Sequence, residues 1–357
     1  MIKEAYNTSI KNMQVMDEDS NVDISLIPKD LDDKKLIEMY KFMNLGRAVS
    51  NKLLALQRLG KVATFAPLNG EEAVQVGSAY AMDKNDYIVP IYRTHLSLIV
   101  RGVPLKSLFT AVKGYEEAYS SISDYHTTPE IIVVGSQFTH AAGIAYGLKY
   151  RRIGNAVIVY GGDGSTSEGD FYEAINFAGV FNLPVIFMIE NNEWAISVPR
   201  SRQSAAETLA QKGVAAGIKS IQVDGNDVLA VYKATKDALE SIKQNGKPVL
   251  IEALTYRMGM HTTSDDPTKY RPEEDVDAWQ KKDPIKRLQR YLISKKIWND
   301  EMEQSMIEEN KELVNQAAKD IESVKSEPEK MFDNVYSFIP ETLQEEKDEA
   351  VKNNFWQ

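Results

Sequence analysis

The chain contains 357 residues, of which 43% are apolar, and it has a formal net charge of −10 at pH 7. This length and apolar content predict a sizeable hydrophobic core, while the acidic balance and the lack of a basic stripe disfavour a nucleic-acid partner. Because cysteine is absent, disulfides, thiolate catalysis and cysteine-ligated metals are all excluded.

The first residues, MIKEAYNTSIKNMQVMDEDS, have neither the apolar segment of a signal peptide nor the acid-free, arginine-rich pattern of a transit peptide. No apolar stretch reaches the length needed to cross a membrane. We therefore expect a cytoplasmic protein with no membrane partner.

The first part of the chain is expected to begin with a polar, extended arm over residues 1–32. Apolar residues at helical spacing, such as Leu36, Met39 and Met43, predict a long helix after it. The elements expected up to residue 150 are helices at Asp32–Leu59, Glu71–Met82, Pro104–Lys113 and Thr139–Lys149, and a strand at Tyr87–Tyr92. Segment 114–130 is polar and is expected to be irregular.

The centre of the chain places polar residues after two predicted strands. Asn155–Tyr160 and Leu183–Ile189 are short apolar runs, and apolar residues at helical spacing between them predict a crossover helix. The two strands are therefore parallel neighbours, whose following turns open at the same edge of one sheet. The first turn contains Asp163, in Gly-Asp-Gly, and the second contains Asn192, in Asn-Asn.

These two turns indicate a site for a metal and a phosphate. A carboxylate and an amide oxygen are hard ligands, of the kind that Mg²⁺ takes when it also holds phosphate. The glycines would let the backbone approach such a ligand, and the helix that follows would offer unpaired N–H groups to an anion. A Gly-Asp-Gly turn alone also serves any tight turn, so the indication depends on both turns together.

The second half of the chain continues the alternation and then becomes helical. The expected elements are strands at Ser220–Val223 and Val249–Tyr256, a helix at Val228–Lys243 between them, a long loop at Met258–Asp275, a helix capped by Asp283 and Pro284, a helix at Asp300–Val324, and an acidic helical end after an apolar patch at Met331–Phe332. The alternation predicts an α/β fold with a doubly wound parallel sheet. We expect an arm at 1–32, an α/β domain at 33–275, and a helical C-terminal extension at 276–357 packed on the same domain.

Several motifs together resemble one family. The run from Gly162 to Asn192 is similar to the thiamine diphosphate motif, GDG followed after a set interval by NN. Four other segments match, in the same order, the alpha subunit of the decarboxylating first component of 2-oxoacid dehydrogenase complexes: FAPLNGEEAVQVGSA (Phe65–Ala79), PIYRTH (Pro90–His95), VVGSQFTHAAGIAYG (Val133–Gly147) and YRMGMHTTSDDPTKYR (Tyr256–Arg271). The resemblance covers nearly the whole chain and implies a sheet of the thiamine diphosphate-binding type.

The resemblance implies which residues bind Mg²⁺ and the terminal phosphate of thiamine diphosphate. Asp163 and Asn192 would bind Mg²⁺ through their side chains, and Trp194 would bind it through its backbone carbonyl. The family usually has Tyr at the position of Trp194, and a backbone ligand tolerates that change. Tyr92 and Arg93 would bind the terminal phosphate, because a guanidinium pairs with phosphate through two hydrogen bonds.

The resemblance also implies less specific roles for several other residues. Arg257 could make a second phosphate contact, and a structural ion pair is an equal alternative for it. Gly164 and Ser165 would offer backbone N–H groups to the phosphates. Ile132 and Val134 match positions whose backbone groups hold the aminopyrimidine ring.

His261 is the candidate catalytic residue. The resemblance places it beside the diphosphate and the reacting carbon, where it would bind phosphate and orient the carboxylate of the oxoacid. No histidines have the spacing of HxxH or HExxH, so zinc is disfavoured. Glu190 stands where the animal branched-chain enzyme has Arg. Because an anion near the diphosphate is unfavourable, we expect Glu190 to point away from the site or to pair with a cation.

The implied activity is oxidative decarboxylation of a small 2-oxoacid with transfer of the acyl group to lipoyllysine of an acyltransferase core. Thiamine diphosphate would supply the electron sink. Family members of this size lack the Glu that activates the cofactor, so a beta subunit is expected to supply it in an α₂β₂ heterotetramer, and the alpha chain alone is expected to be inactive.

The substrate remains open between several alternatives. Val223–Ala238, Thr262–Asp266 and Met331–Pro340 favour a branched-chain 2-oxoacid, and hence branched-chain amino acid catabolism. The same chemistry on pyruvate or acetoin is an alternative, and a non-catalytic regulatory or scaffold subunit is an alternative of another class. A nicotinamide oxidoreductase is disfavoured because GxGxxG does not follow the first strand of the central run.

Overall fold

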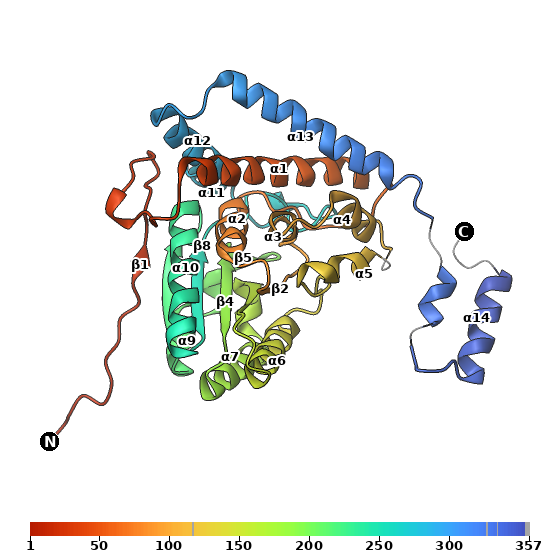
Figure 1. Ribbon diagram of the computed structural model, residues 1–357, viewed down its shortest axis with the longest axis horizontal. Helices are drawn as coiled ribbons and strands as arrows, with labels where there is room; N and C mark the ends of the chain where they lie inside the picture. Colours follow the sequence, from red (N-terminus) through yellow and green to blue (C-terminus); the bar gives the residue numbers. More distant parts are fainter. Residues whose placement is uncertain (116–117, 326–327, 334, 354–357) are drawn as a thin grey trace.

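The computed structural model describes the chain except for residues 116–117, 326–327, 334 and 354–357. Its centre is a six-stranded parallel sheet in the order β1-β7-β8-β4-β3-β2 (Figure 1). The strands are β1 (Asn12–Met13), β2 (Tyr87–Val89), β3 (Val157–Gly162), β4 (Val185–Asn191), β7 (Lys219–Asp224) and β8 (Val249–Leu254). A separate antiparallel hairpin joins β5 (Trp194–Ala195) to β6 (Val198–Pro199).

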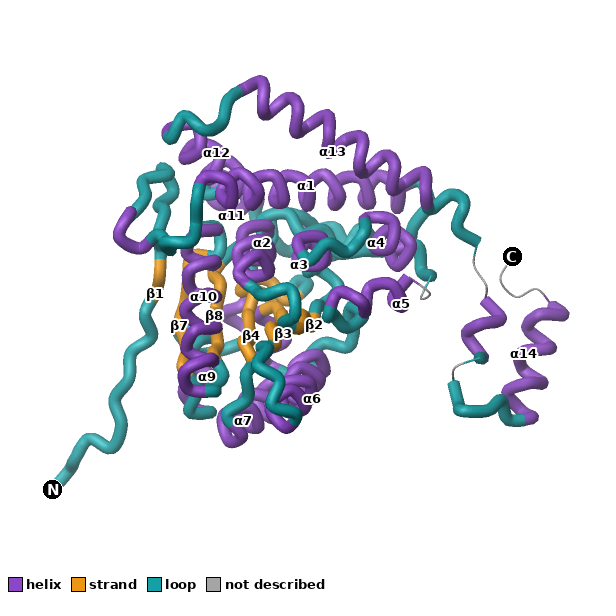
Figure 2. The backbone as a smooth tube through the Cα atoms, in the orientation of Figure 1, coloured by secondary structure: helices purple, strands orange, loops and turns teal. Residues whose placement is uncertain are grey.

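Helices cover both faces of the sheet (Figure 2), so the central strands β3, β4 and β8 are buried almost throughout. Successive residues of β3 and β4 alternate between two apolar clusters: Ile158 and Ile186 belong to one, and Val159 and Phe187 to the other. The first cluster contains residues of α1 (Asp33–Arg58), α2 (Glu72–Ala81) and α10 (Val228–Asn245), and the second contains residues of α6 (Ser136–Tyr150) and α7 (Gly169–Phe181). The predicted doubly wound α/β fold is confirmed.

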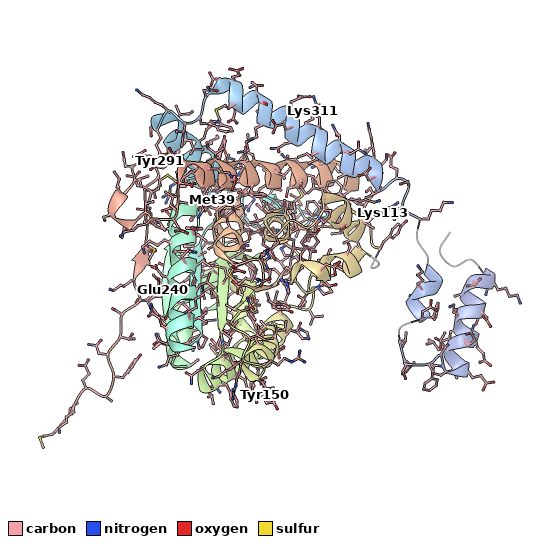
Figure 3. The ribbon with its side chains drawn as sticks, viewed as in Figure 1. Met39, Lys113, Tyr150, Glu240, Tyr291 and Lys311 are labelled. Atoms are coloured by element: carbon pink, nitrogen blue, oxygen red, sulfur yellow. The ribbon has the colours of Figure 1, made fainter. Side chains whose placement is uncertain are left out.

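The remaining helices are short or lie at the periphery. They are α3 (His95–Val100), α4 (Leu105–Val112), α5 (Ala118–Ile122), α8 (Arg200–Gln203), α9 (Gln211–Ala215), α11 (Glu273–Gln280), α12 (Pro284–Ser294), α13 (Asp300–Asp320) and α14 (Glu341–Asn353). Figure 3 shows Met39 of α1 inside the molecule, whereas Lys311 of α13 and Tyr150 of α6 lie on its outside. None of the described helices is long and apolar enough to cross a membrane.

The N-terminal segment differs from a free polar arm. β1 pairs with β7 at the edge of the sheet, and Val15 and Met16 are buried. The carboxylate of Asp227 accepts hydrogen bonds from the backbone N–H groups of both residues, at 2.7 Å each. The guanidinium of Arg287, which is fully buried, donates to the carbonyl oxygens of Met16 and Asp17. These contacts join the segment to residues more than 200 positions away.

One other expectation is partly wrong. The segment 114–130 contains α5 and a 3₁₀ helix at Ser123–Tyr125 rather than irregular chain alone.

The C-terminal extension has two parts in this structure. α12 and α13 pack against α1. α14 packs against a 3₁₀ helix at Pro328–Phe332, and Figure 1 shows this pair standing apart from the rest of the molecule. The division of the chain at residues 32 and 275 stays a prediction.

Candidate active site

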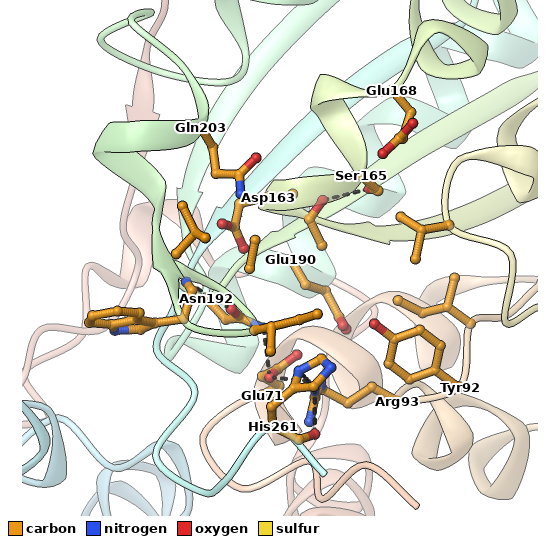
Figure 4. A pocket seen from close by; sticks show the side chains of 18 of the residues that line it. Glu71, Tyr92, Arg93, Asp163, Ser165, Glu168, Glu190, Asn192, Gln203 and His261 are labelled. Carbon is orange, nitrogen blue, oxygen red and sulfur yellow. Dashed lines mark hydrogen bonds and ion pairs between the residues drawn. The ribbon is translucent and has the colours of Figure 1, made fainter. Parts of the chain in front are cut away.

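A cavity of about 350 Å³ lies at the carboxyl ends of the central strands (Figure 4). Its lining includes Tyr92, Arg93, Asp163, Gly164, Ser165, Asn192, Trp194, Val134 and His261. The register of β3 and β4 explains this gathering, because Gly162 is opposite Glu190 and both chains turn immediately afterwards. Open parallel sheets bind ligands at this edge.

Asp163, in the turn after β3, is a buried carboxylate with one oxygen left unpartnered by the described part of the chain. Its side chain is 1% exposed, and its Oδ2 atom has no hydrogen-bond partner among the described residues. Burial is the main cause that raises the pKa of Asp163, to about 7, and the nearby charges of Glu193 and Glu71 act in the same direction. A bound cation would remove this penalty, because a buried carboxylate is stabilised by an opposite charge.

Asn192 is held by two contacts at the end of β4. Its Nδ2 group donates to Oε1 of Glu71 at 3.0 Å, and its Oδ1 atom accepts from the backbone N–H of Trp194 at 3.2 Å. Among the described residues, no three His, Asp or Glu side chains are arranged to hold a metal ion. The carboxylate of Asp163 and the amide of Asn192 nevertheless line the same cavity.

Arg257 is engaged with the protein and does not line the cavity. It is fully buried, and its guanidinium donates to the carbonyl oxygens of Trp194 at 3.0 Å and Ile196 at 2.6 Å, and to the hydroxyl of Tyr270 at 2.8 Å. These contacts hold the β5–β6 hairpin beside the turn after β3. Of the two alternatives for Arg257, these contacts favour the structural role. They are hydrogen bonds to carbonyl and hydroxyl groups, however, rather than the expected ion pair.

Arg93 and His261 lie in contact with each other in the lining of the cavity (Figure 4). Arg93 is 4% exposed and donates to the carbonyl of Pro67 at 2.6 Å, to the carbonyl of His261 at 2.9 Å and to Nδ1 of His261 at 3.0 Å. The ring of Tyr92 packs edge-on against the imidazole, with centroids 6.2 Å apart.

His261 is neutral and has a defined tautomer. Burial, followed by the charges of Arg93 and Arg257, lowers the pKa of His261 to about 4. Both arginines approach Nδ1, and an arginine can only donate, so Nδ1 is the acceptor and the ring proton resides on Nε2. The imidazole can therefore donate from Nε2 to a ligand at neutral pH.

The other expected site residues lie around the same opening. Gly164 is pressed against the β5–β6 hairpin, since a Cβ atom built on it would lie 2.6 Å from that of Ala195. The hydroxyl of Ser165 donates to the carbonyl of Gly162 at 2.5 Å, which closes the turn. Ile132 and Val134 are 76% and 42% exposed, and they line a second cavity of about 560 Å³ that shares Tyr92 and His261 with the first.

The expectation for Glu190 is wrong. Glu190 is 1% exposed and lines the cavity, where it contacts the carboxyl group of Glu71 and the side chain of Gln75, and it forms no ion pair among the described residues. Burial, followed by repulsion from Glu71, raises the pKa of Glu190 well above its usual value. Burial also raises the pKa of Glu71, although the charge of Arg93 opposes this. Glu71 was not anticipated as a site residue; its only sequence signal is its place in the GEEA segment.

Comparisons with known proteins agree with this arrangement. Residues 40–330 match the family model described as dehydrogenase E1 component. The chain belongs to this family. It is 40% identical over 336 residues, 94% of its own length and 91% of the relative, to the pyruvate dehydrogenase E1 component subunit alpha of Staphylococcus aureus strain Mu50. The subunit of the same name from Staphylococcus epidermidis strain RP62A has the same identity and coverage.

The family membership indicates the general chemistry, and the names of the relatives bear on the substrate. The chain is of the alpha-subunit type of the thiamine diphosphate-dependent 2-oxoacid dehydrogenases. The relatives are named as pyruvate dehydrogenase subunits, so they support the pyruvate alternative better than the branched-chain reading.

Proposed function

We propose that the chain is the alpha subunit of a pyruvate dehydrogenase-type E1 component and contributes the metal and phosphate half of a site for thiamine diphosphate. The observation that carries this proposal is the convergence of Asp163, Asn192 and Arg93 on one buried cavity. The cavity presents an uncompensated carboxylate beside a guanidinium. A divalent cation that carries a diphosphate would satisfy both groups.

The residues at the edge of the sheet fit Mg²⁺. Asp163 has a free oxygen, and Oδ1 of Asn192 keeps a lone pair beyond its contact with Trp194 N–H. The carbonyl of Trp194 accepts from Arg257 and likewise retains one lone pair. Mg²⁺ takes hard oxygen ligands and keeps phosphate and water in its remaining positions, which matches a site with three protein oxygens.

The remaining cavity residues would bind and orient the cofactor. Arg93 and Tyr92 would bind the terminal phosphate, and the backbone N–H groups of Gly164 and Ser165 would contact its oxygens. Bound thiamine diphosphate would supply the electron sink for decarboxylation. His261 would donate from Nε2 to the diphosphate or to the carboxylate of the oxoacid, without carrying a positive charge of its own.

The partners follow from the same proposal. Ile132 and Val134, proposed to hold the aminopyrimidine ring through backbone groups, are exposed and line the second cavity, which adjoins the first. A second subunit would cover these residues, so we assign the chain to an α₂β₂ heterotetramer that passes its acyl group to a lipoyl acyltransferase core. Pyruvate is the proposed substrate because the relatives bear that name.

Calorimetry and a substrate panel test the proposal. The chain assembled with its beta subunit should bind thiamine diphosphate only when Mg²⁺ is present, and Asp163→Ala should abolish this binding without unfolding the protein. The assembled enzyme should transfer the acyl group of pyruvate in preference to that of branched-chain 2-oxoacids, and in preference to cleaving acetoin, which has no carboxyl group to lose. The alpha chain alone should be inactive. Cofactor binding that requires no Mg²⁺ and is unchanged by Asp163→Ala would refute the proposed site. A preference for branched-chain 2-oxoacids would refute pyruvate as the substrate.

A further inference from the structure

Glu71 occupies an unusual place for an acidic residue. It precedes α2 directly, is fully buried, and lines a cavity proposed to hold an anion. Its Oε1 atom accepts the hydrogen bond from Nδ2 of Asn192 at 3.0 Å and lies 3.6 Å from Nε of Arg93. One carboxylate therefore contacts both the proposed metal-binding amide and the proposed phosphate-binding guanidinium.

The contact with Glu71 determines which way the amide of Asn192 faces. An ionised carboxylate can only accept, and the neighbouring guanidinium of Arg93 favours that form of Glu71, so the NH₂ group of Asn192 points to Glu71. The backbone N–H of Trp194 can only donate, so it selects the oxygen of the same amide. Both contacts specify one orientation, in which Oδ1 is directed away from Glu71 and keeps a lone pair for a cation.

We propose that Glu71 is a positioning residue that orients Asn192 for the divalent cation and ties this ligand to Arg93. The inference rests on the proposed function, since it concerns the same metal site. Residues that hold a metal ligand from behind tune metal affinity by about 10–100-fold. Glu71 would act in this way without touching the cation itself.

The neighbouring residue Glu72 provides a matched control. It is also fully buried, but its oxygens are occupied by Nε of Arg47 at 2.7 Å and by the backbone N–H of Gly70 at 2.9 Å. It does not line the cavity. Substitutions at Glu72 therefore test the loss of a buried, bonded carboxylate in the same turn, without a change in the orientation of Asn192.

The test measures thiamine diphosphate affinity by calorimetry as a function of Mg²⁺ concentration, on the full chain assembled with its beta subunit. Glu71→Ala should raise the Mg²⁺ concentration for half-maximal binding about 10–100-fold. Glu71→Gln should keep most of the affinity, because its amide oxygen can still accept from Asn192. Glu72→Gln should leave the Mg²⁺ requirement unchanged even if it lowers the unfolding temperature.

A donor–acceptor exchange keeps the test decisive if Glu71→Ala does not fold. Asn192→Asp alone places two carboxylates against each other and should weaken Mg²⁺ binding. Combining it with Glu71→Gln restores a hydrogen bond in the reverse sense and should recover part of the loss, so that the two substitutions are not additive. Additive effects, or equal shifts from Glu71→Ala and Glu72→Gln, would overturn the positioning role. A wild-type protein that binds no cofactor at any Mg²⁺ concentration would instead refute the proposed function.

Discussion

The close contact between Gly164 and Ala195 allows a direct test of how the site is assembled. A methyl group added at Gly164 would lie 2.6 Å from Cβ of Ala195 and 3.6 Å from its Cα atom. Non-bonded carbon atoms prefer about 3.5–4.0 Å, so the β5–β6 hairpin must move away by roughly 1 Å. Such overpacking costs about 1–3 kcal/mol. It would also displace the carbonyl of Trp194, which precedes Ala195 in the hairpin.

We therefore expect Gly164→Ala to lower stability and cofactor binding together. For a chain of this length, about 1–3 kcal/mol corresponds to a fall of about 1–4 °C in the unfolding temperature. Calorimetric titration of the assembled protein should show weaker Mg²⁺-dependent binding of thiamine diphosphate. Gly169→Ala is the matched control, because nothing lies within 4 Å of a Cβ atom added at Gly169.

A second substitution, at Ala195, separates the effect of the steric clash from other effects of placing alanine at residue 164. Ala195→Gly removes the atom that Gly164→Ala would strike, so the double variant should recover most of the lost binding. A small loss of stability from the added glycine, of about 0.5–1 kcal/mol, should remain. Unchanged binding in Gly164→Ala, or a double variant no better than the single one, would refute the assembly of the site described above.

Three further predictions concern stability. Gly77→Ala should destabilise the chain by about 1–3 kcal/mol in thermal unfolding, since the new Cβ would lie 2.9 Å from the carbonyl of Val228 and from Cβ of Val231; Gly143→Ala, with open space around it, is the control. Arg287→Met should lower the free energy of unfolding by about 3–5 kcal/mol, because it leaves Asp224 without its ion-pair partner. It should also speed hydrogen exchange at the amides of residues 12–17, because Arg287 binds the carbonyls of Met16 and Asp17. The same substitution at the exposed Arg290 should have neither effect. Burial, and then the charge of Arg93, lowers the pKa of His95 to about 4. Between pH 6.5 and 4 the unfolded chain therefore binds more protons than the folded chain, and the free energy of unfolding decreases as the pH falls. Denaturation at pH 7 and pH 5 should show a smaller decrease for His95→Gln than for wild type or for the exposed His140→Gln.

The core of the fold could be predicted because its signals are local and strong. β3 and β4 are continuous apolar runs that end in polar turns, and each was predicted to within three residues at either end. β1 could not be predicted in this way. It has only two residues and pairs with β7, and the residues that follow it, Val15–Asp17, are held by Asp227 and Arg287, both more than 200 positions away. Such contacts leave no periodic pattern in the sequence.

The error at Glu190 has a physical cause. The prediction assumed that an acidic residue in a strand can turn toward solvent or a cation. Because helices cover both faces of the sheet, every residue of β4 is buried, and Glu190 has no solvent-facing side.

The contacts of Arg257 could not be predicted for a different reason. It binds two backbone carbonyls whose positions depend on the path of the β5–β6 hairpin, and residue types alone do not specify that path.

The charges of the cavity explain why metal and diphosphate should bind together. Among the described residues, Oδ2 of Asp163 has no hydrogen-bond partner, the buried carboxyl groups of Glu71 and Glu190 repel each other, and Arg93 is buried in the same cavity. A cation alone would compensate the acids but repel the guanidinium, and a diphosphate alone would do the reverse. Each ligand therefore reduces the electrostatic cost of the other, and this coupling must be reciprocal. We expect thiamine diphosphate to raise the affinity for Mn²⁺, a paramagnetic substitute for Mg²⁺, by the same factor by which Mn²⁺ raises the affinity for thiamine diphosphate. Independent binding of the two ligands would contradict a single shared site.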